Sequence, residues 1–206
     1  MMEQLSFFSE SGQTPGLPSD LLQYIPDFFS ESESEHYLSQ LITVTPWKQK
    51  VVSMYDKQVV TPRLSAWYAD PEIYDYTSLR KSSPNFWTPE LMDIRNKVEA
   101  FTGIKFNSVL LNYYRDANDS VAWHSDNEEA LGTHPVIASL SLGQVRGFDI
   151  RNKQNHKQKY TVKLENGSLL LMKGNLQQHW DHRIAKSTKR MKERINLTFR
   201  IVQEKK

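Results

Sequence analysis

Apolar side chains recur at helical spacing in two stretches of the chain. Residues 30–33 match a capping box and predict a helix that runs to about Ile42. Thr88-Pro89 supplies a cap and a first helical residue for a second helix, which Gly103 ends. The side chains expected to face the core from these helices are Tyr37, Leu38, Leu41, Ile42, Leu91, Ile94, Val98 and Phe101.

Period-two alternation replaces the helical spacing in the rest of the chain. Residues 47–69 predict two strands joined by a hairpin turn at 54–57. The later strand candidates are 107–114, 135–142, 147–151, 158–164, 168–172, 178–183 and 194–202. Short strands at this spacing are typical of a sandwich or barrel. With two helices before them, they predict an α+β fold whose β part is a jelly roll.

Residues 194–201 alternate without a break. One face carries Ile195, Leu197, Phe199 and Ile201, and the other carries Arg194, Asn196, Thr198 and Arg200. An ordinary half-exposed strand shows the same pattern. If the polar face turned into the interior, however, its two arginines would form an anion cradle, because a guanidinium pairs bidentately with carboxylates and stays charged when buried.

Another strand offers groups that fit the same ligand. Asn112 and Tyr114 lie two residues apart, so an amide and a phenol project from one face and can donate to the same carboxylates. A buried tyrosine with an ordinary partner is the alternative. Ile137 and Ser139 could line the same interior.

The tripeptide His124-Ser125-Asp126 places an imidazole and a carboxylate two residues apart. In an extended segment both side chains project from one face. With a distant second histidine they would form the two-His, one-carboxylate triad that leaves open positions on Fe(II). A surface histidine beside a turn aspartate is the alternative for so short a motif.

Composition narrows the class of protein. The chain has 206 residues, 38% of them hydrophobic, which suits one globular domain after a flexible leader at 1–18. The absence of cysteine excludes disulfides and thiolate metal sites, and a reducing cytoplasm is expected. We find no apolar run that could span a bilayer, no signal peptide, and nothing that demands more than a monomer.

Charge divides the chain. Up to Val145 there are 10 Lys and Arg against 19 Asp and Glu, whereas from Arg146 onward there are 16 against 5. A basic half favours a polyanionic partner only slightly, because solvated basic surfaces are common.

Taken in order, these motifs resemble the AlkB family of Fe(II)/2-oxoglutarate dioxygenases, which dealkylate nucleic acids. The resemblance covers about residues 20–202 and is nearest to the branch of human homologues 2 and 3. The segments that carry it are Pro62 to Tyr68, Asn112-x-Tyr114, His124-x-Asp126, Pro135 to Gly143, Trp180-x-His182 and Arg194 to Arg200.

The resemblance implies a fold and a site within a single domain at 19–206. The fold is a double-stranded β-helix over about 106–202, with buttressing helices and an N-terminal nucleotide-recognition lid over about 47–87. The implied iron ligands are His124, Asp126 and His182, chosen over His156 and His179. The residues implied for 2-oxoglutarate are Asn112, Tyr114, Arg194, Asn196 and Arg200, with Arg194 at the distal carboxylate and Arg200 near the metal. Ser139, which could line the same interior, is a further candidate for the cosubstrate.

On the substrate side, the resemblance places Tyr74 and Tyr76 against the extruded base and Glu128 near its exocyclic nitrogen. Core packing and a solvated glutamate are the respective alternatives. Arg63 is a candidate phosphate contact. The turn at Met54-Tyr55 could wedge into a duplex, although it departs from the strand-separating finger of the family.

The implied activity is oxidative demethylation of 1-methyladenine and 3-methylcytosine in alkylated DNA or RNA. It would consume O2 and 2-oxoglutarate and release succinate and formaldehyde, and basic residues from Arg146 to Lys192 would steer the phosphate backbone. Two other functions stay open. The same iron core could modify a protein, lipid or tRNA base, or the chain could be a non-catalytic jelly-roll that binds nucleic acid.

Overall fold

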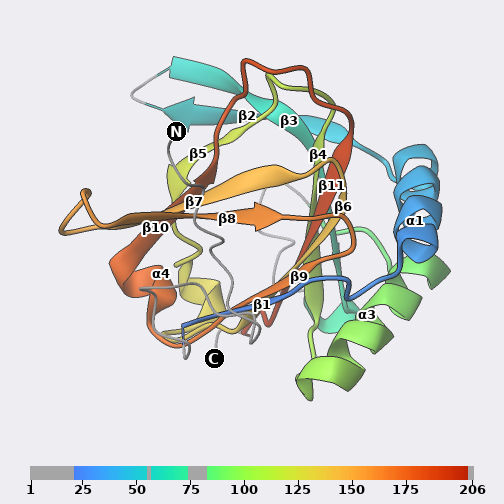
Figure 1. Cartoon of the computed structure of the whole chain (residues 1–206). Coiled ribbons are helices and arrows are strands. Elements are labelled where there is room, and N and C mark those ends of the chain that lie inside the picture. Colours follow the sequence, from blue (N-terminus) through green and yellow to red (C-terminus); the bar gives the residue numbers. More distant parts are fainter. Residues whose placement is uncertain (1–20, 55–56, 74–82, 204–206) are drawn as a thin grey trace.

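The computed structural model describes residues 21–54, 57–73 and 83–203, and within them the strands form two antiparallel sheets (Figure 1). The major sheet has the order β1 (Leu22–Ile25), β9 (Leu169–Met172), β6 (Ile137–Gly143), β11 (Arg194–Arg200), β4 (Ser108–Tyr114), β3 (Lys57–Ala69) and β2 (Lys48–Met54). The minor sheet has the order β5 (Val121–His124), β10 (Trp180–Ile184), β7 (Arg146–Asn152) and β8 (Lys159–Leu164). This arrangement confirms the predicted α+β jelly roll.

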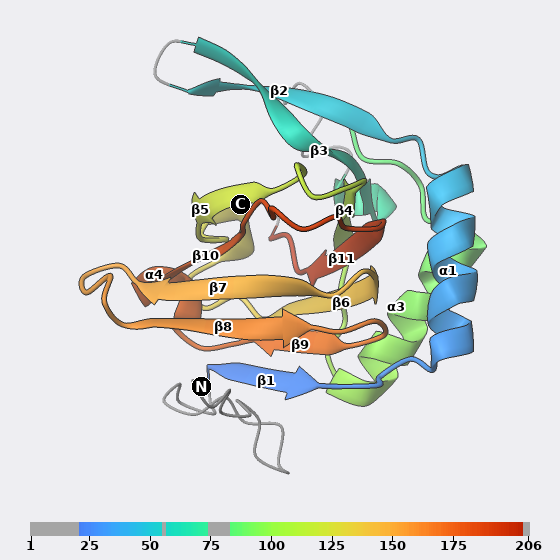
Figure 2. The ribbon, with the colours of Figure 1, turned by 45° about the horizontal axis from the view of Figure 1, so that its top comes forward.

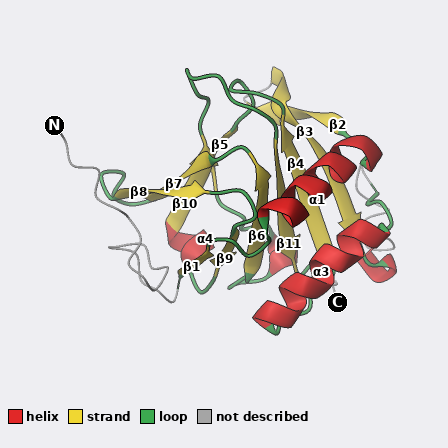
Figure 3. Ribbon diagram, turned by 45° about the vertical axis from the view of Figure 1, so that its right-hand side comes forward, coloured by secondary structure: helices red, strands yellow, loops and turns green. Residues whose placement is uncertain are grey.

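Two helices cover the outer face of the major sheet (Figure 3). In α1 (Glu31–Val44) both halves of the predicted capping box are present, and α3 (Pro89–Thr102) is capped by Thr88. Gly103 ends α3 with a φ of 69°, a left-handed conformation that glycine adopts without the steric cost of a Cβ. Helical residues such as Leu41, Leu91, Ile94 and Val98 are fully buried there. They pack in one cluster with the apolar face of β11.

One residue of the predicted helical stripe is not in this core. Phe101 is 49% exposed and packs edge to face against Phe28. Phe101 lies one residue before the end of α3 and only about 20° around the helix axis from the fully buried Ile94. Its place at the end of the helix, and not its direction, separates it from the core. The prediction that Phe101 is buried was wrong for that reason.

A second apolar cluster fills part of the space between the two sheets. It includes Phe148 and Ile150 from β7, Val162 from β8, and Trp180 and Ile184 from β10. The four residues of α4 (Leu176–His179) lead directly into β10, and a 3-10 turn, η1 (Glu129–Leu131), follows β5. Between the two sheets lies a hollow lined by polar and apolar side chains, which holds the candidate site.

The strands β2 and β3 form a long hairpin whose turn end projects away from the two helices (Figure 2). It occupies the predicted lid region and includes exposed Val51, Val59 and Val60. The turn residues Tyr55 and Asp56, and the leader at 1–18, lie outside the described residues.

Every helix in the described part of the chain is too short or too polar to cross a lipid bilayer.

Candidate metal centre and cosubstrate pocket

A cavity of about 160 Å³ lies between the two sheets. Its polar lining consists of Arg63, Asn112, Tyr114, His124, Asp126, Glu128, Ser139, His182, Arg194, Asn196, Thr198 and Arg200. All candidate site residues within the described ranges are in this set. Tyr74 and Tyr76 lie outside those ranges, so their predicted contact with a base stays a prediction.

Strand pairing brings the two histidines together. His182 of β10 lies directly opposite His124 of β5, and the centroids of their rings are 4.3 Å apart. The His124 Nδ1 lies 2.9 Å from the carbonyl oxygen of Ala122. Because a carbonyl can only accept, Nδ1 is the donor of this hydrogen bond, which leaves Nε2 as the ring atom that can ligate a metal.

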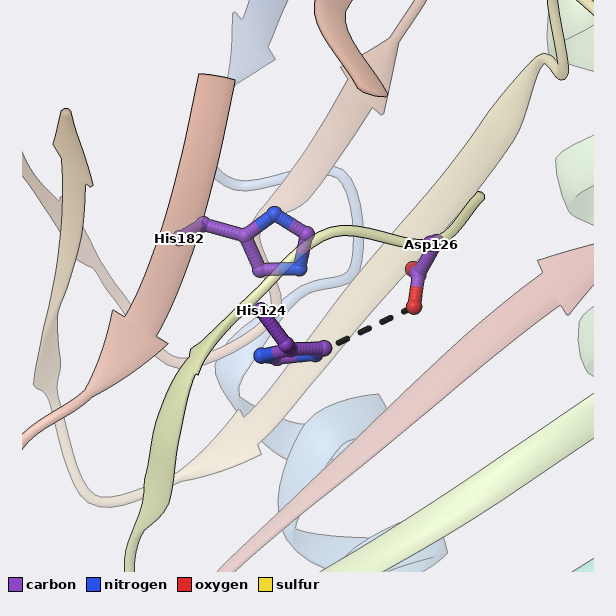
Figure 4. A group of neighbouring side chains, drawn as sticks. All are labelled: His124, Asp126 and His182. Atoms are coloured by element: carbon purple, nitrogen blue, oxygen red, sulfur yellow. Dashed lines mark ion pairs between the residues drawn. The ribbon is translucent and has the colours of Figure 1, made fainter. Parts of the chain in front are cut away.

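Asp126 completes the group (Figure 4). One ligand atom from each of His124, Asp126 and His182 lies within 4.8 Å of the other two. The strand β5 ends at His124, so Asp126 belongs to the segment beyond it. Its backbone N–H donates to Gln177 Oε1 at 2.9 Å, and its carboxylate accepts from Arg200 Nη2 at 2.8 Å.

The charge states of these side chains suit a cation. Burial alone would raise the pKa of Asp126, but Arg200 and the two histidines lower it below the ordinary aspartate value. Burial, with His124 beside it, lowers the pKa of His182 to about 4. At neutral pH the site therefore offers an ionised carboxylate and a neutral imidazole, the forms that bind metal.

The opposite end of the cavity contains a buried cation. Arg194 is 1% exposed, and burial lowers its pKa to about 10. Its Nη2 donates to Ser141 Oγ at 3.0 Å, and its guanidinium lies 5.1 Å from the centre of the Tyr114 ring. Its Nε and Nη1 donate to no protein atom in the described residues. The only carboxylates in the described lining are Asp126 and Glu128, which both lie near Arg200.

Neutral donors occupy the wall between the two ends. Asn196 donates to Ser139 Oγ at 2.8 Å and accepts from Thr198 Oγ1 at 3.0 Å. On β4, Asn112 accepts from Arg63 Nε at 2.8 Å. The Arg63 side chain, which was predicted to contact a phosphate of the nucleic acid, thus turns into the cavity and lines it.

Sequence reasoning missed several residues of this site. Apolar side chains that line the cavity are Leu110, Val121, Phe148, Leu164, Met172 and Ile184. Phe148 also stacks on His182, with ring centroids 5.0 Å apart. Ser141 continues the inward alternation of Ile137 and Ser139 and could have been found from that spacing. Gln177 gave no local signal, because it acts on a segment 51 residues away.

The competing histidines lie elsewhere. His156 is exposed in the loop between β7 and β8, and His179 is exposed at the end of α4. Neither belongs to the group of three ligands. His179 was predicted to lie on a strand, but it ends a helical turn and β10 begins one residue later.

A jelly roll that holds two histidines and one carboxylate beside an anion-binding arginine defines a class, the non-haem iron oxygenases. The profile of the 2OG-Fe(II) oxygenase superfamily matches residues 21–200. The chain belongs to this superfamily and, within it, to the AlkB family.

Individual relatives support the narrower assignment. The chain is 39% identical over 185 residues to alpha-ketoglutarate-dependent dioxygenase alkB homolog 3 from rat, across 86% of this chain and 62% of that protein. It is 31% identical over 214 residues to DNA oxidative demethylase ALKBH2 from Arabidopsis thaliana, across 91% of this chain and 68% of that protein. The chain therefore spans less than two thirds of the length of the rat protein.

A solved structure, that of OsALKBH1, shares the fold. It superposes with a TM-score of 0.59 and 15% identity, covering 89% of this chain and 99% of the solved chain. At that identity the likeness bears on the fold alone.

Family membership implies Fe(II), 2-oxoglutarate and O2, and the cavity fits the first two. Three ligands of the right chemistry meet at one point, which leaves room for further ligands on an octahedral ion. Two nitrogens of the buried Arg194 have no hydrogen-bond acceptor among the described residues, and the cavity lining around Arg194 contains no carboxylate. An unpaired buried cation is costly, so an anionic group from a ligand is the partner that this end of the cavity lacks.

Proposed function

We propose that the protein demethylates N-alkylated bases, 1-methyladenine and 3-methylcytosine, in DNA or RNA, with Fe(II) and 2-oxoglutarate. The observation that carries this proposal is the joint presence, in one cavity, of a buried His-Asp-His group and an unpaired buried arginine. The names of the relatives, a dioxygenase and a DNA oxidative demethylase, support the reaction class.

In this proposal one end of the cavity binds the metal and the other binds 2-oxoglutarate. His124, Asp126 and His182 hold the metal, and Arg200 keeps Asp126 ionised through its 2.8 Å hydrogen bond. At the far end Arg194 binds the distal carboxylate of 2-oxoglutarate. Asn112, Tyr114, Ser139 and Asn196 orient the cosubstrate between them.

When bound, Fe(II) with 2-oxoglutarate and O2 supplies the oxidation of an N-methyl group, with succinate, carbon dioxide and formaldehyde as products. The protein contributes position and exclusion of water. Phe148, Met172 and Ile184 make the wall beside His182 apolar, so few competing ligands reach the metal. His124 is the more open ligand, since its side chain is 38% exposed, and the substrate would approach from that side.

The substrate contacts are part of the same proposal. The Glu128 side chain is 57% exposed at the mouth of the cavity, beside Arg200, where it can accept from an exocyclic amino group. A methyl group on the Watson–Crick edge is out of reach in a paired duplex, so the base must be flipped or single-stranded. The β2–β3 hairpin is the proposed lid, with Tyr74 and Tyr76 as proposed stacking partners.

A basic loop supports a nucleic-acid substrate. Lys186, Lys189, Arg190 and Lys192 are all exposed between β10 and β11, and none forms an ion pair with a described residue. Such cations release counterions from a phosphate backbone on binding. We further propose one catalytic domain over 19–206, acting as a monomer in the cytoplasm.

The direct test offers the protein a panel of single- and double-stranded DNA and RNA that carry 1-methyladenine or 3-methylcytosine. Mass spectrometry should show loss of the methyl group, with one formaldehyde per methyl removed. Formaldehyde release without loss of a base methyl would instead indicate a protein, lipid or other modified target. Binding without any turnover of 2-oxoglutarate would indicate a non-catalytic binder.

A further inference from the structure

The segment that carries Asp126 is not held by the sheet. The ladder between β5 and β10 pairs His124 with His182 and Val121 with Ile184, with an irregularity between them. Ser125 and Asp126 follow the last paired residue, and they belong to no strand. A metal ligand in such a segment needs another tether, because coordination tolerates only small errors in position.

A side chain from α4 supplies that tether. Gln177 is 2% exposed, and its Oε1 accepts from the backbone N–H of Asp126 at 2.9 Å. A backbone N–H can only donate, so the amide must present its oxygen to Asp126. Its Nε2 then faces the Met172 Sδ at 3.6 Å, a weak acceptor. The strong hydrogen bond of this buried amide is thus the one to Asp126.

Lys153 ties the same two segments a second time. Its Nζ donates to Ser125 Oγ at 2.9 Å and to the carbonyl oxygen of Gln177 at 2.8 Å. Its backbone N–H donates to the carbonyl oxygen of His179 at 2.9 Å. The side chain of Lys153 therefore links the Asp126 segment to α4, and its backbone is held to the same helical turn at His179.

We propose that Gln177 is a positioning residue for the metal centre, which fixes Asp126 relative to His182. His182 lies five residues beyond Gln177, since α4 runs directly into β10. A bond from Gln177 to Asp126 therefore sets the spacing of two ligands that come from distant parts of the sequence. Arg200 contacts the carboxylate itself, whereas Gln177 acts on the backbone beneath it. This inference rests on the proposed metal role of the three ligands.

The test compares two neighbouring glutamines. Gln177→Met keeps the length and the apolar contact of the side chain and removes the acceptor. Gln178→Met makes the same substitution at an exposed residue, whose side-chain amide donates to the Thr133 carbonyl oxygen. Titration with Co(II), followed by visible absorption, gives the dissociation constant of each protein without any turnover. Partners of this kind change metal affinity by about 10- to 100-fold, so we expect that loss for Gln177→Met and none for Gln178→Met.

A third variant separates positioning from packing. Gln177→Glu retains an acceptor oxygen, and we expect its Co(II) affinity to lie nearer to wild type than that of Gln177→Met. Equal losses in both variants, or a Gln177→Met constant within twofold of wild type, would overturn the inference. If Gln177→Met does not fold, the same Co(II) titration is made with Lys153→Met, which removes the link between Ser125 and Gln177. An unchanged Co(II) affinity of Lys153→Met would then count against the inference. If the wild-type protein itself does not bind Co(II), the proposed metal site is wrong, whatever the variants show.

Discussion

At the scale of single residues, Arg194 has the largest fully buried side chain in the described part of the chain. Such a guanidinium costs several kcal/mol to desolvate unless partners surround it. Here Ser141 Oγ accepts one hydrogen bond, and two nitrogens of Arg194 are buried without an acceptor among the described residues. We therefore expect this arginine to lower the stability of the ligand-free protein and to raise its affinity for an anion.

This gives Arg194→Met two opposite effects. Removal of a charge-assisted hydrogen bond, at about 1.5–3 kcal/mol, should raise the KM for 2-oxoglutarate by about 10- to 100-fold. Burial of an apolar side chain in its place should leave the melting temperature of the ligand-free protein unchanged or higher. Calorimetry and succinate release measure the two effects.

The affinity for Co(II) without 2-oxoglutarate is the internal control for that variant and should stay within twofold of wild type. A lower melting temperature together with an unaltered KM would mean that Arg194 is a structural residue.

Residue-level chemistry was predictable only in part. Period-two alternation within a strand predicts the inward face of β11, and it predicts that Asn112 and Tyr114 lie on the same face of β4. The choice of His182 over His156 and His179 came from the family resemblance, and the exposure of the other two agrees with it. The tether from Gln177 to Asp126 could not be predicted, because it depends on how α4 lies against the segment that follows β5.

At the scale of elements, α3 is fastened to β4 through one buried carboxylate. Glu99 accepts from Arg95 Nε, Lys105 Nζ and the backbone N–H of Phe106, at 2.9, 2.6 and 2.9 Å. Burial alone would raise the pKa of Glu99, but Lys105, the Phe106 N–H and Arg95 together lower it below the ordinary value. The ionised form therefore holds the turn between the helix and the sheet.

The stability of the protein should depend on pH through this residue. Because the pKa of Glu99 is lower in the folded chain than in the unfolded chain, its contribution is present above the unfolded pKa and is lost as pH falls through the folded pKa. We expect Glu99→Gln to lower the free energy of unfolding by about 1–3 kcal/mol near neutral pH, and the difference to shrink in acid.

Urea unfolding at a series of pH values measures that difference. Asp93→Asn is the matched control, since Asp93 is exposed on the same helix and forms no ion pair with a described residue. A difference for Glu99→Gln that does not change with pH would show that packing, and not charge, accounts for its effect.

Element prediction succeeded where the signal was long. Both helices and all seven later strand candidates are present, as is the hairpin at 47–69. The four-residue strands β1 and β5 were not among the strand candidates, whereas the equally short β9 was, because its four residues form a continuous apolar run. Phe101 was misplaced because it lies at the end of α3, where a direction shared with the buried Ile94 does not bring it into the core.

At the scale of the whole molecule, one face of the major sheet packs against the helices and the other face lines the cavity. The outer face is apolar and packs under α1 and α3, where it stabilises the fold. The inner face is polar near its centre and, with the minor sheet, encloses the cavity. β11 contributes to both, with Ile195, Leu197 and Phe199 outward and Arg194, Asn196 and Thr198 inward. The order of strands in the two sheets was beyond sequence reasoning, since pairing between distant strands leaves no local pattern.

The central claim is that three side chains from β5, the segment after it, and β10 hold Fe(II) while arginines of β11 hold 2-oxoglutarate beside it. An anaerobic titration of the protein with Fe(II) and 2-oxoglutarate tests it most directly. We predict a weak visible absorption band from the metal and the keto acid, which saturates at one Fe(II) per chain and is absent from Asp126→Ala. A wild-type protein without the band, or an Asp126→Ala protein with the same band at the same Fe(II) concentration, would contradict the account.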